Sequence, residues 1–170
     1  MTESLEFYLP DEPLAPEPLR YDASGLEGVR LLNGFVLEDD PDLGPLVTIE
    51  QQDDLHRAIA LHIIEQQRPM TGPEIRFIRK LTGRTQAELA RELRVDAQTV
   101  ANYEKGRGVP EPSDLLMRVI FTLTLLPQDA TVGAIREVIA SDAVETARRA
   151  LPAPERRRVA CAWRETPRAA

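Results

Sequence analysis

The sequence predicts a mainly α-helical fold organised around two short helices joined by a tight turn. Only 5% of its 170 residues are aromatic, which is a low share for a chain built from strands. Apolar residues recur at helical spacing between residues 48 and 66. The region from residue 85 to 106 contains the start and stop signals of two further helices. Together these observations favour a helical domain over a sheet-based one.

The first of the two short helices begins with a capping box. Thr85 and Glu88 have the S/T-x-x-E spacing, in which each side chain bonds the backbone N–H of the other residue. The apolar residues that follow share one face of the helix: Leu89, Ala90 and Leu93. The pattern therefore predicts an amphipathic helix that packs one side against a core.

A second short helix follows after a turn at Arg94-Val95. Asp96 is suited to cap its start, and Gly106 is suited to end it. Two apolar residues occupy its inward positions: Val100 and Tyr103. This spacing is typical of a helix-turn-helix, whose second helix lies in the major groove of DNA.

The polar residues on the outward side of the second helix are candidates for base reading. They occupy its N-terminal half, where such a helix meets base edges: Gln98, Thr99 and Asn102. The carboxamides of Gln98 and Asn102 can each accept from adenine N6 and donate to N7, which is worth roughly 1 to 3 kcal/mol of discrimination. Thr99 is suited to contact a thymine methyl group or a phosphate. The alternative is that Gln86, Gln98 and Asn102 are ordinary exposed polar residues of a helix.

The charge around these helices is positive, although the whole chain carries a net charge of −7. Nine bases surround them: Arg68, Arg76, Arg79, Lys80, Arg84, Arg91, Arg94, Lys105 and Arg107. Five acids lie among these bases: Glu74, Glu88, Glu92, Asp96 and Glu104. The surplus of four suits a phosphate backbone, because DNA affinity depends on the local patch. We interpret six residues as phosphate contacts: Arg84, Thr85, Gln86, Ala97, Lys105 and Arg107. Glu104 instead suits an ion pair or a helix end.

These residues resemble the Xre-type helix-turn-helix domain, in which T-Q-x-x-L-A near the start of the second helix and Y-E-K-G at the end of the third recur. Residues 73–81, with the sequence PEIRFIRKL, resemble its first helix. The PEPS step at residues 110–113, followed by LLMRVIF, resembles the entry to its next helix. The resemblance covers residues 70–126 and implies a five-helix, lambda-repressor-like domain that binds DNA.

Within that superfamily the sequence is similar to the C-terminal domain of MqsA-type antitoxins, with which it shares Y-E-K-G, a Pro-x-Pro-Ser step and a following L-x-R-V segment. The base-reading side chains of that family match Gln98 and Asn102, so the resemblance implies the residues that the helical pattern also selects. Those antitoxins carry an N-terminal zinc domain with two C-x-x-C pairs, whereas this chain has only Cys161. A zinc site on that plan is excluded, and we expect neither a metal nor a cofactor.

Composition divides the chain into five segments. They are an acidic, proline-rich region at 1–47, a connecting helix at 48–68, the DNA-binding domain at 69–126, a helical or dimerisation segment at 127–151 and a basic flexible tail at 152–170. The first 50 residues hold twelve acids against Arg20 and Arg30, a net charge of −10. Four prolines in the first 20 residues favour a flexible or extended arm. The sequence GVRLLNGFVLE then predicts a short β-hairpin with its turn at Asn33-Gly34.

Two features of the flanking segments remain to be interpreted. His56 and His62 lie six residues apart in the connecting helix, not at the i, i+4 spacing of two metal ligands, so we interpret them as surface or core residues. The arginine-rich tail is expected to be a loose extension that either has no role or touches phosphate. Trp163 is the one tail residue that indicates docking.

The run from Leu115 to Leu126 is apolar around more of its circumference than one face of a small domain needs to bury. In one interpretation, one face closes the core and the other joins a two-fold partner, because such repressors need two recognition helices one DNA turn apart. The candidate interface residues are Leu116, Ile120, Phe121 and Leu123. The alternative is that the following helices cover this surface within one chain.

The sequence therefore favours a homodimeric repressor that binds an inverted repeat in double-stranded DNA with residues 97–104. The second class is an antitoxin that binds a toxin through its N-terminal region and represses its own operon. An enzyme has little support, because the chain has no GxSxG, P-loop or HExxH motif. The longest apolar run is too short to span a bilayer and no secretory signal is visible, so we expect a cytoplasmic protein without a membrane partner.

Overall fold

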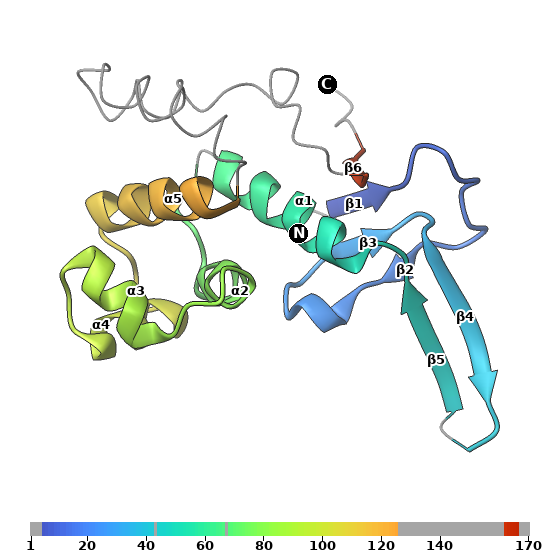
Figure 1. Cartoon of the computed structure of the whole chain (residues 1–170), viewed down its shortest axis with the longest axis horizontal. Helices are drawn as coiled ribbons and strands as arrows, with labels where there is room; N and C mark the ends of the chain where they lie inside the picture. Colours follow the sequence, from blue (N-terminus) through green and yellow to red (C-terminus); the bar gives the residue numbers. More distant parts are fainter. Residues whose placement is uncertain (1–4, 43, 67, 126–161, 167–170) are drawn as a thin grey trace. The chain divides into compact units, whose positions relative to one another are not determined.

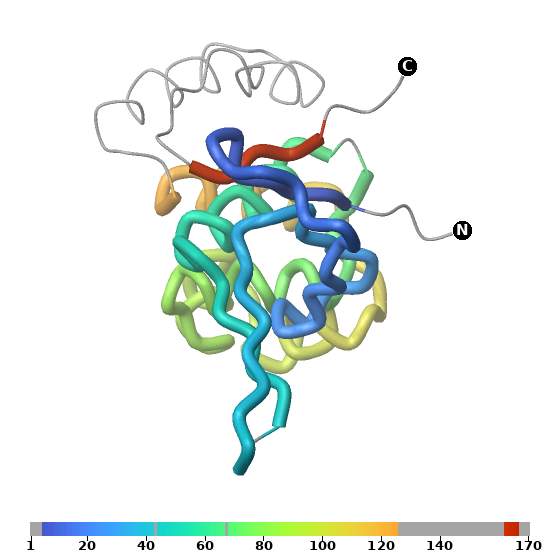
Figure 2. The backbone as a smooth tube through the Cα atoms, turned by 90° about the vertical axis from the view of Figure 1, so that its right-hand side faces the viewer, coloured from blue at the N-terminus to red at the C-terminus, as the bar shows by residue number. Residues whose placement is uncertain are grey.

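The computed structural model describes four ranges of the chain: residues 5–42, 44–66, 68–125 and 162–166. Within them it contains six strands and five α-helices, which Figure 1 labels. The chain divides into two compact units, one made of residues 1–58 and 161–170 and the other of residues 59–160. Figure 2 follows the backbone in a second view. We describe each unit by itself.

The first unit contains a four-stranded sheet whose strands come from both ends of the sequence. The order is β2 (Leu19–Arg20), β3 (Val29–Leu31), β1 (Leu5–Tyr8) and β6 (Arg164–Glu165). β1 is parallel to β3 and antiparallel to β6, and β2 is antiparallel to β3. A short 3-10 helix, η1 (Asp22–Ser24), follows β2. Alternate strand residues such as Val29 and Leu31 are buried, because successive side chains of a strand point to opposite faces.

This sheet corrects two expectations about the ends of the chain. Residues 5–20, predicted as a flexible or extended arm, contribute two strands and bury Phe7. In the predicted loose tail, Trp163 is buried and its indole Nε1 donates to the carbonyl of Glu50 at 3.0 Å. The docking expected for Trp163 is confirmed. Otherwise the composition of each end predicted exposure to solvent, whereas pairing between β1 and β6 decides their structure. The segment expected to be helical at 127–151, and the tail outside residues 162–166, lie outside the described residues.

A β-hairpin forms in this unit, but at a different position from the one predicted. β4 (Phe35–Asp40) pairs with β5 (Gly44–Ile49), and residues 41–43 connect them. The predicted turn at Asn33-Gly34 instead connects β3 to β4, which belong to different sheets. The prediction of a hairpin in this region holds, and the prediction of its turn is wrong.

The contacts of Asn33 and Gly34 explain why they do not form a two-residue turn. The buried Asn33 side chain donates to the carbonyls of Leu9 and Glu12 and accepts from the backbone N–H of Leu9. Gly34 has a φ of +69° and lies so close to Trp163 that a Cβ atom there would be 2.5 Å from the indole ring. Asn33 and Gly34 therefore make contacts with residues far away in the sequence, and the local preference of Asn-Gly for tight turns does not predict such contacts.

α1 (Gln52–Glu65) lies within the segment predicted as a connecting helix, and it contains the division between the two units. Three buried residues recur at helical spacing: Leu55, Ile59 and Ile63. His56 Nε2 lies 2.7 Å from Tyr21 Oη, and His62 Nε2 lies 2.7 Å from Gln66 Nε2. Each histidine thus has a hydrogen-bond partner: Tyr21 for His56 and Gln66 for His62.

The second unit is a group of short helices around one apolar core. It contains α2 (Gly72–Leu81), α3 (Gln86–Leu93), α4 (Ala97–Glu104) and α5 (Glu111–Leu125), besides the end of α1. Its largest fully buried side chains are Ile75, Ile78, Leu89, Met117 and Phe121, with those of α1. The prediction of a mainly helical fold is confirmed here. The first unit, predicted as a small extension with at most a hairpin, is built on two sheets.

A buried arginine of α5 holds the segment that connects α1 to α2. Arg118 is 5% exposed, and its Nε donates to Asp114 Oδ2 at 2.7 Å. Its Nη atoms donate to carbonyls at and beyond the end of α1: Ile63, Ile64, Gln66 and Arg68. Asp114 Oδ1 accepts from the backbone N–H of Met70 at 2.8 Å. The pair thus satisfies backbone groups that a helix end leaves without partners.

We expect Arg118→Met to lower the free energy of unfolding by about 3 kcal/mol or more, because Asp114 would remain as a buried charge without its partner. Urea denaturation of the full chain, followed by circular dichroism, measures the change. Lys80→Met removes an exposed charge of α2 and should change stability by only about 0.5 kcal/mol. Equal effects of the two substitutions would contradict a structural role for Arg118.

Candidate nucleic-acid interface

α3 begins at the predicted capping box. Thr85 Oγ1 accepts from the backbone N–H of Glu88 at 3.2 Å, and Glu88 Oε2 accepts from the backbone N–H of Thr85 at 2.8 Å. The helix ends at Leu93, and its C-cap residue, Arg94, has a left-handed backbone with a φ of +56°. This residue starts the turn that the sequence predicts between the two helices.

α4 starts and ends within one residue of the expected positions, but the cap at its start differs from the prediction. Asp96 is the N-cap residue, yet its side chain makes no capping hydrogen bond. Its carbonyl oxygen accepts from the N–H of Thr99 at 2.9 Å instead. At the other end Lys105 is the C-cap residue, and Gly106 follows with a φ of +76°. The short α4 therefore begins with backbone bonding alone.

The three candidate base-reading residues lie together on the surface of α4. Gln98 is exposed, and Thr99 and Asn102 are half-buried. Gln98 Nε2 donates to Asn102 Oδ1 at 3.3 Å, so the two carboxamides lie side by side one turn apart. This bond uses one donor of Gln98 and one lone pair of Asn102, and each amide keeps a donor and an acceptor. The pair can therefore still meet the N6 and N7 atoms of adenine.

The structure separates the six candidate phosphate contacts into two groups. Three of them already serve the fold: Arg84 pairs with Glu92 at 2.9 Å, Thr85 forms the capping box, and the amide of Gln86 donates to Glu104 at 2.9 Å. The other three are exposed: Ala97, Lys105 and Arg107. Lys105 and Arg107 follow α4 directly, and we therefore regard these two bases as the stronger candidates.

Ion pairs use up four of the nine bases that the sequence places around these helices. Arg68 pairs with Glu74, Arg84 pairs with Glu92, and Arg76 and Arg79 both approach Glu104. The remaining five are exposed and form no ion pair with any described residue: Lys80, Arg91, Arg94, Lys105 and Arg107. From the sequence, Lys80, Arg91 and Arg94 are predicted only as part of the basic patch. Their lack of an acidic partner, which the sequence does not reveal, makes them further candidates.

Glu104 joins three helices, in agreement with the ion pair expected for it. Its side chain is 4% exposed. Arg79 of α2 donates to both of its carboxylate oxygens, and Gln86 of α3 donates to Oε2. Arg79 Nη1 also donates to the carbonyl of Arg84, ahead of α3, at 2.7 Å. Burial alone would raise the pKa of Glu104, but the hydrogen bonds from Arg79 and Gln86 outweigh it and lower that pKa below its usual 4.5.

The backbones of α2 and α4 also approach each other closely, at Gly72 and the end of α4. A Cβ atom at Gly72 would lie 2.5 Å from the carbonyl oxygen of Glu104 and 2.9 Å from that of Tyr103. Only a residue without a side chain therefore fits the first turn of α2. This contact and the Glu104 network both hold the C-terminal end of α4.

We expect Glu104→Ala to lower the free energy of unfolding by about 3 kcal/mol at pH 7, because Arg79 would lose its buried partner. A carboxylate with a lowered pKa stabilises the fold above its unfolded pKa, and this contribution is lost as the pH falls through the folded pKa. The difference between wild type and variant should therefore shrink below about pH 4.5. Urea denaturation across pH 3 to 8 measures it, with the exposed Glu17→Ala as control. A difference that does not depend on pH would contradict the role of the carboxylate charge.

The described residues contain no group of three or more His, Cys, Asp or Glu that could hold a metal ion. Among the same residues, no helix combines the length and the apolar character needed to cross a membrane. The site described above consists of side chains that can bind by hydrogen bonds and charge.

Comparison with known proteins gives one match. Residues 75–117, from α2 into α5, match the family model of the helix-turn-helix. No curated protein and no solved structure matches the chain. The matched segment contains the capping box, the turn and the surface of α4 described above. Residues 75–117 are therefore similar to a helix-turn-helix domain, which supports the expected Xre-type fold for this segment and a role for this chain as a DNA-binding regulator.

Proposed function

We propose that the chain is a transcriptional repressor that recognises a specific sequence in double-stranded DNA, with α4 in the major groove. The observation that carries this proposal is the pair of adjacent carboxamides of Gln98 and Asn102 on the surface of α4. A bidentate carboxamide is the side chain that suits adenine in the major groove. Thr99 between them is suited to a thymine methyl group or to a phosphate.

The surrounding charge supports DNA as the ligand. The five exposed bases without an ionic partner among the described residues flank the two helices, and Lys105 and Arg107 come directly after α4. Bases that release counterions from phosphate supply affinity without sequence preference, whereas contacts to base edges supply the preference. Both kinds of contact are available on one short stretch of the chain.

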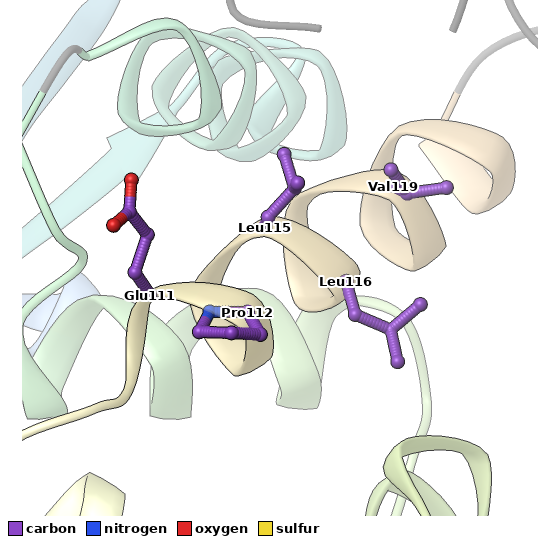
Figure 3. Close-up of a pocket in the computed structure, with 5 residues that line it drawn as sticks. All are labelled: Glu111, Pro112, Leu115, Leu116 and Val119. Atoms are coloured by element: carbon purple, nitrogen blue, oxygen red, sulfur yellow. The ribbon is translucent and has the colours of Figure 1, made fainter. Parts of the chain in front are cut away.

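The repressor acts as a homodimer in this proposal, and the surface of α5 supports it. A recess of about 280 Å³ on α5 is lined by Glu111, Pro112, Leu115, Leu116 and Val119. Figure 3 shows these five side chains. Leu116 is 40% exposed, and Ile120 and Leu123 are half-buried. Phe121, which the sequence also suggested for this interface, is fully buried in the core and is not available for contact. A two-fold contact through Leu116 and its neighbours would bring two copies of α4 to one inverted repeat.

The second candidate is an antitoxin that binds a toxin through its N-terminal region and represses its own operon. Two observations favour it: the similarity to the DNA-binding domain of MqsA-type antitoxins, and the strongly acidic first 50 residues. We propose for both candidates a cytoplasmic protein that acts by binding rather than by catalysis, with no cofactor. A neighbouring gene that encodes no small toxin would exclude the second candidate.

Replacing a base-reading residue should change sequence preference, and replacing a phosphate contact should not. We expect Asn102→Ala or Gln98→Ala to cost roughly 1 to 3 kcal/mol on the specific site and little on a scrambled duplex. Lys105→Ala or Arg107→Ala should weaken both duplexes and reduce the salt slope by about one unit. Fluorescence anisotropy with the chain's own upstream DNA, at several salt concentrations, measures both effects. Equal losses of Asn102→Ala on specific and scrambled DNA would contradict base reading.

Replacing Leu116 should separate the proposed dimer. We expect the wild-type chain to show twice its monomer mass of 19.0 kDa in size exclusion with light scattering, and Leu116→Glu to show the monomer mass. Leu14→Glu is the matched control, because Leu14 is 64% exposed and belongs to the other unit. A wild-type chain that stays monomeric as its concentration is raised would exclude this interface.

A further inference from the structure

The hairpin of β4 and β5 is a second surface with the character of a binding site. The two strands form a sheet of their own, and no other described strand pairs with them. Figure 1 shows the hairpin as a long ribbon that leaves the rest of the first unit. An isolated two-stranded hairpin is at best marginally stable in water. A ribbon that exposes its length to solvent therefore needs an anchor at its base or a partner along its face.

The anchor is visible at the base of the hairpin. The backbone N–H of Glu50 donates to the carbonyl of Gly34 at 2.9 Å, which closes the two strands where they start and end. Trp163 lies against Gly34 and donates to Glu50 at 3.0 Å. The base of the hairpin is thus held by the core of the unit.

The strand register collects apolar side chains on one face. Phe35 pairs with Ile49, and Leu37 pairs with Val47 two residues along, so all four share the same face. We call these four residues the hairpin stripe. Leu37 is 61% exposed and Val47 is 47% exposed. The opposite face holds polar or acidic residues between its apolar ones, because Val36 pairs with Thr48, and Glu38 with Leu46.

The hairpin stripe continues into a recess beside β5. This recess has a volume of about 450 Å³ and is lined by Val47, Thr48 and Ile49, and by the stretch from Leu19 to Ala23 with Gln52. All of these residues belong to the first unit. A flat apolar stripe that ends in a recess can receive a protruding apolar side chain of another protein. Contiguous exposed apolar surface of this kind is a mark of protein interaction sites.

The charge of the hairpin defines the chemistry of the partner. Residues 35–50 contain five acids and no Lys, Arg or His: Glu38, Asp39, Asp40, Asp42 and Glu50. This charge repels nucleic acid and anionic lipid, and it attracts a surface rich in lysine and arginine. Complementary charge around an apolar centre is the arrangement of specific protein interfaces.

We propose that the face of the β4–β5 hairpin that carries the hairpin stripe is a docking surface for a basic protein. Its apolar side chains cover Leu37 and Val47, while its lysines and arginines meet Asp39 on the same face and Asp42 in the connection between the strands. The surface does not include any residue of α3 or α4. The proposal therefore stands or falls independently of DNA binding.

Site-specific photo-crosslinking of the full chain in its native cells tests the proposal. The probe is p-benzoylphenylalanine, placed at Leu37 in one protein and at Leu14 in the control, because Leu14 is an exposed leucine of the same unit outside the hairpin. We expect an adduct with one protein at position 37 that is absent at position 14, and mass spectrometry should identify a sequence with excess Lys and Arg. No specific adduct at position 37, an adduct only with a second copy of this chain, or an acidic partner would overturn the proposal.

The cross-linked protein is then purified, and its affinity for the unmodified chain is measured by calorimetry. Leu37→Glu should weaken binding by about tenfold or more, and Val36→Glu, on the opposite face, by less than about threefold. Binding should also weaken as the salt concentration rises. Both variants should bind DNA as the wild type does, which separates this test from that of the DNA-binding surface. Equal losses from the two substitutions, or an affinity that salt does not change, would contradict the assigned face and charge.

Discussion

The buried carboxylate of Glu104 holds the end of α4, the helix on which the proposed DNA recognition depends. It lies at the end of α4 and receives hydrogen bonds from Arg79 of α2 and Gln86 of α3, so one side chain joins three helices. α4 is only eight residues long, and a helix of this length is marginal by itself in water. Its position therefore comes from tertiary contacts. The outward carboxamides of Gln98 and Asn102 therefore lie on a helix whose end is held by contacts with its neighbours.

A second pair of an arginine and a carboxylate, Arg118 and Asp114, holds another part of the helical unit in place. Arg118 and Asp114 bind the backbone between α1 and α2, where the chain would otherwise leave buried carbonyl and N–H groups without partners. In both networks a planar guanidinium with several donors bridges groups that lie far apart in the sequence. The helical unit is thus stabilised by a small apolar core and by two buried networks of hydrogen bonds and ion pairs, one around Glu104 and one around Arg118.

The local signals of the sequence predicted the helical unit well. The capping box of Thr85 and Glu88, the turn at Arg94 and the buried side of α4 all depend on residues within a few positions of one another, and the structure confirms them. The side chain of Asp96 is an exception, because a polar residue at the N-cap position does not have to make the capping bond. The pairing of particular charges, such as Arg84 with Glu92, also depends on packing that the sequence alone does not give.

The first unit could not be predicted in the same way, because its structure depends on contacts between distant residues. Asn33-Gly34 has the composition of a tight turn. However, the Asn33 side chain bonds Leu9, 24 positions away, and Gly34 lies against Trp163, more than 100 positions away. β6 is only two residues long and has no pattern of its own. Strands of this kind are defined by their neighbours, and a window along the sequence contains only one side of each pair.

The pairing of β1 with β6 has a consequence for how the chain folds. Strand residues near position 7 must wait for residues near position 165, so the four-stranded sheet of the first unit is completed only after residue 165 has been synthesised. The helices between them depend mainly on local contacts and can form while translation continues, since domains commonly fold as they leave the ribosome. The nascent chain would therefore form the helices of the second unit first, while the edge of β1 that pairs with β6 stays open until residues 164 and 165 have left the ribosome.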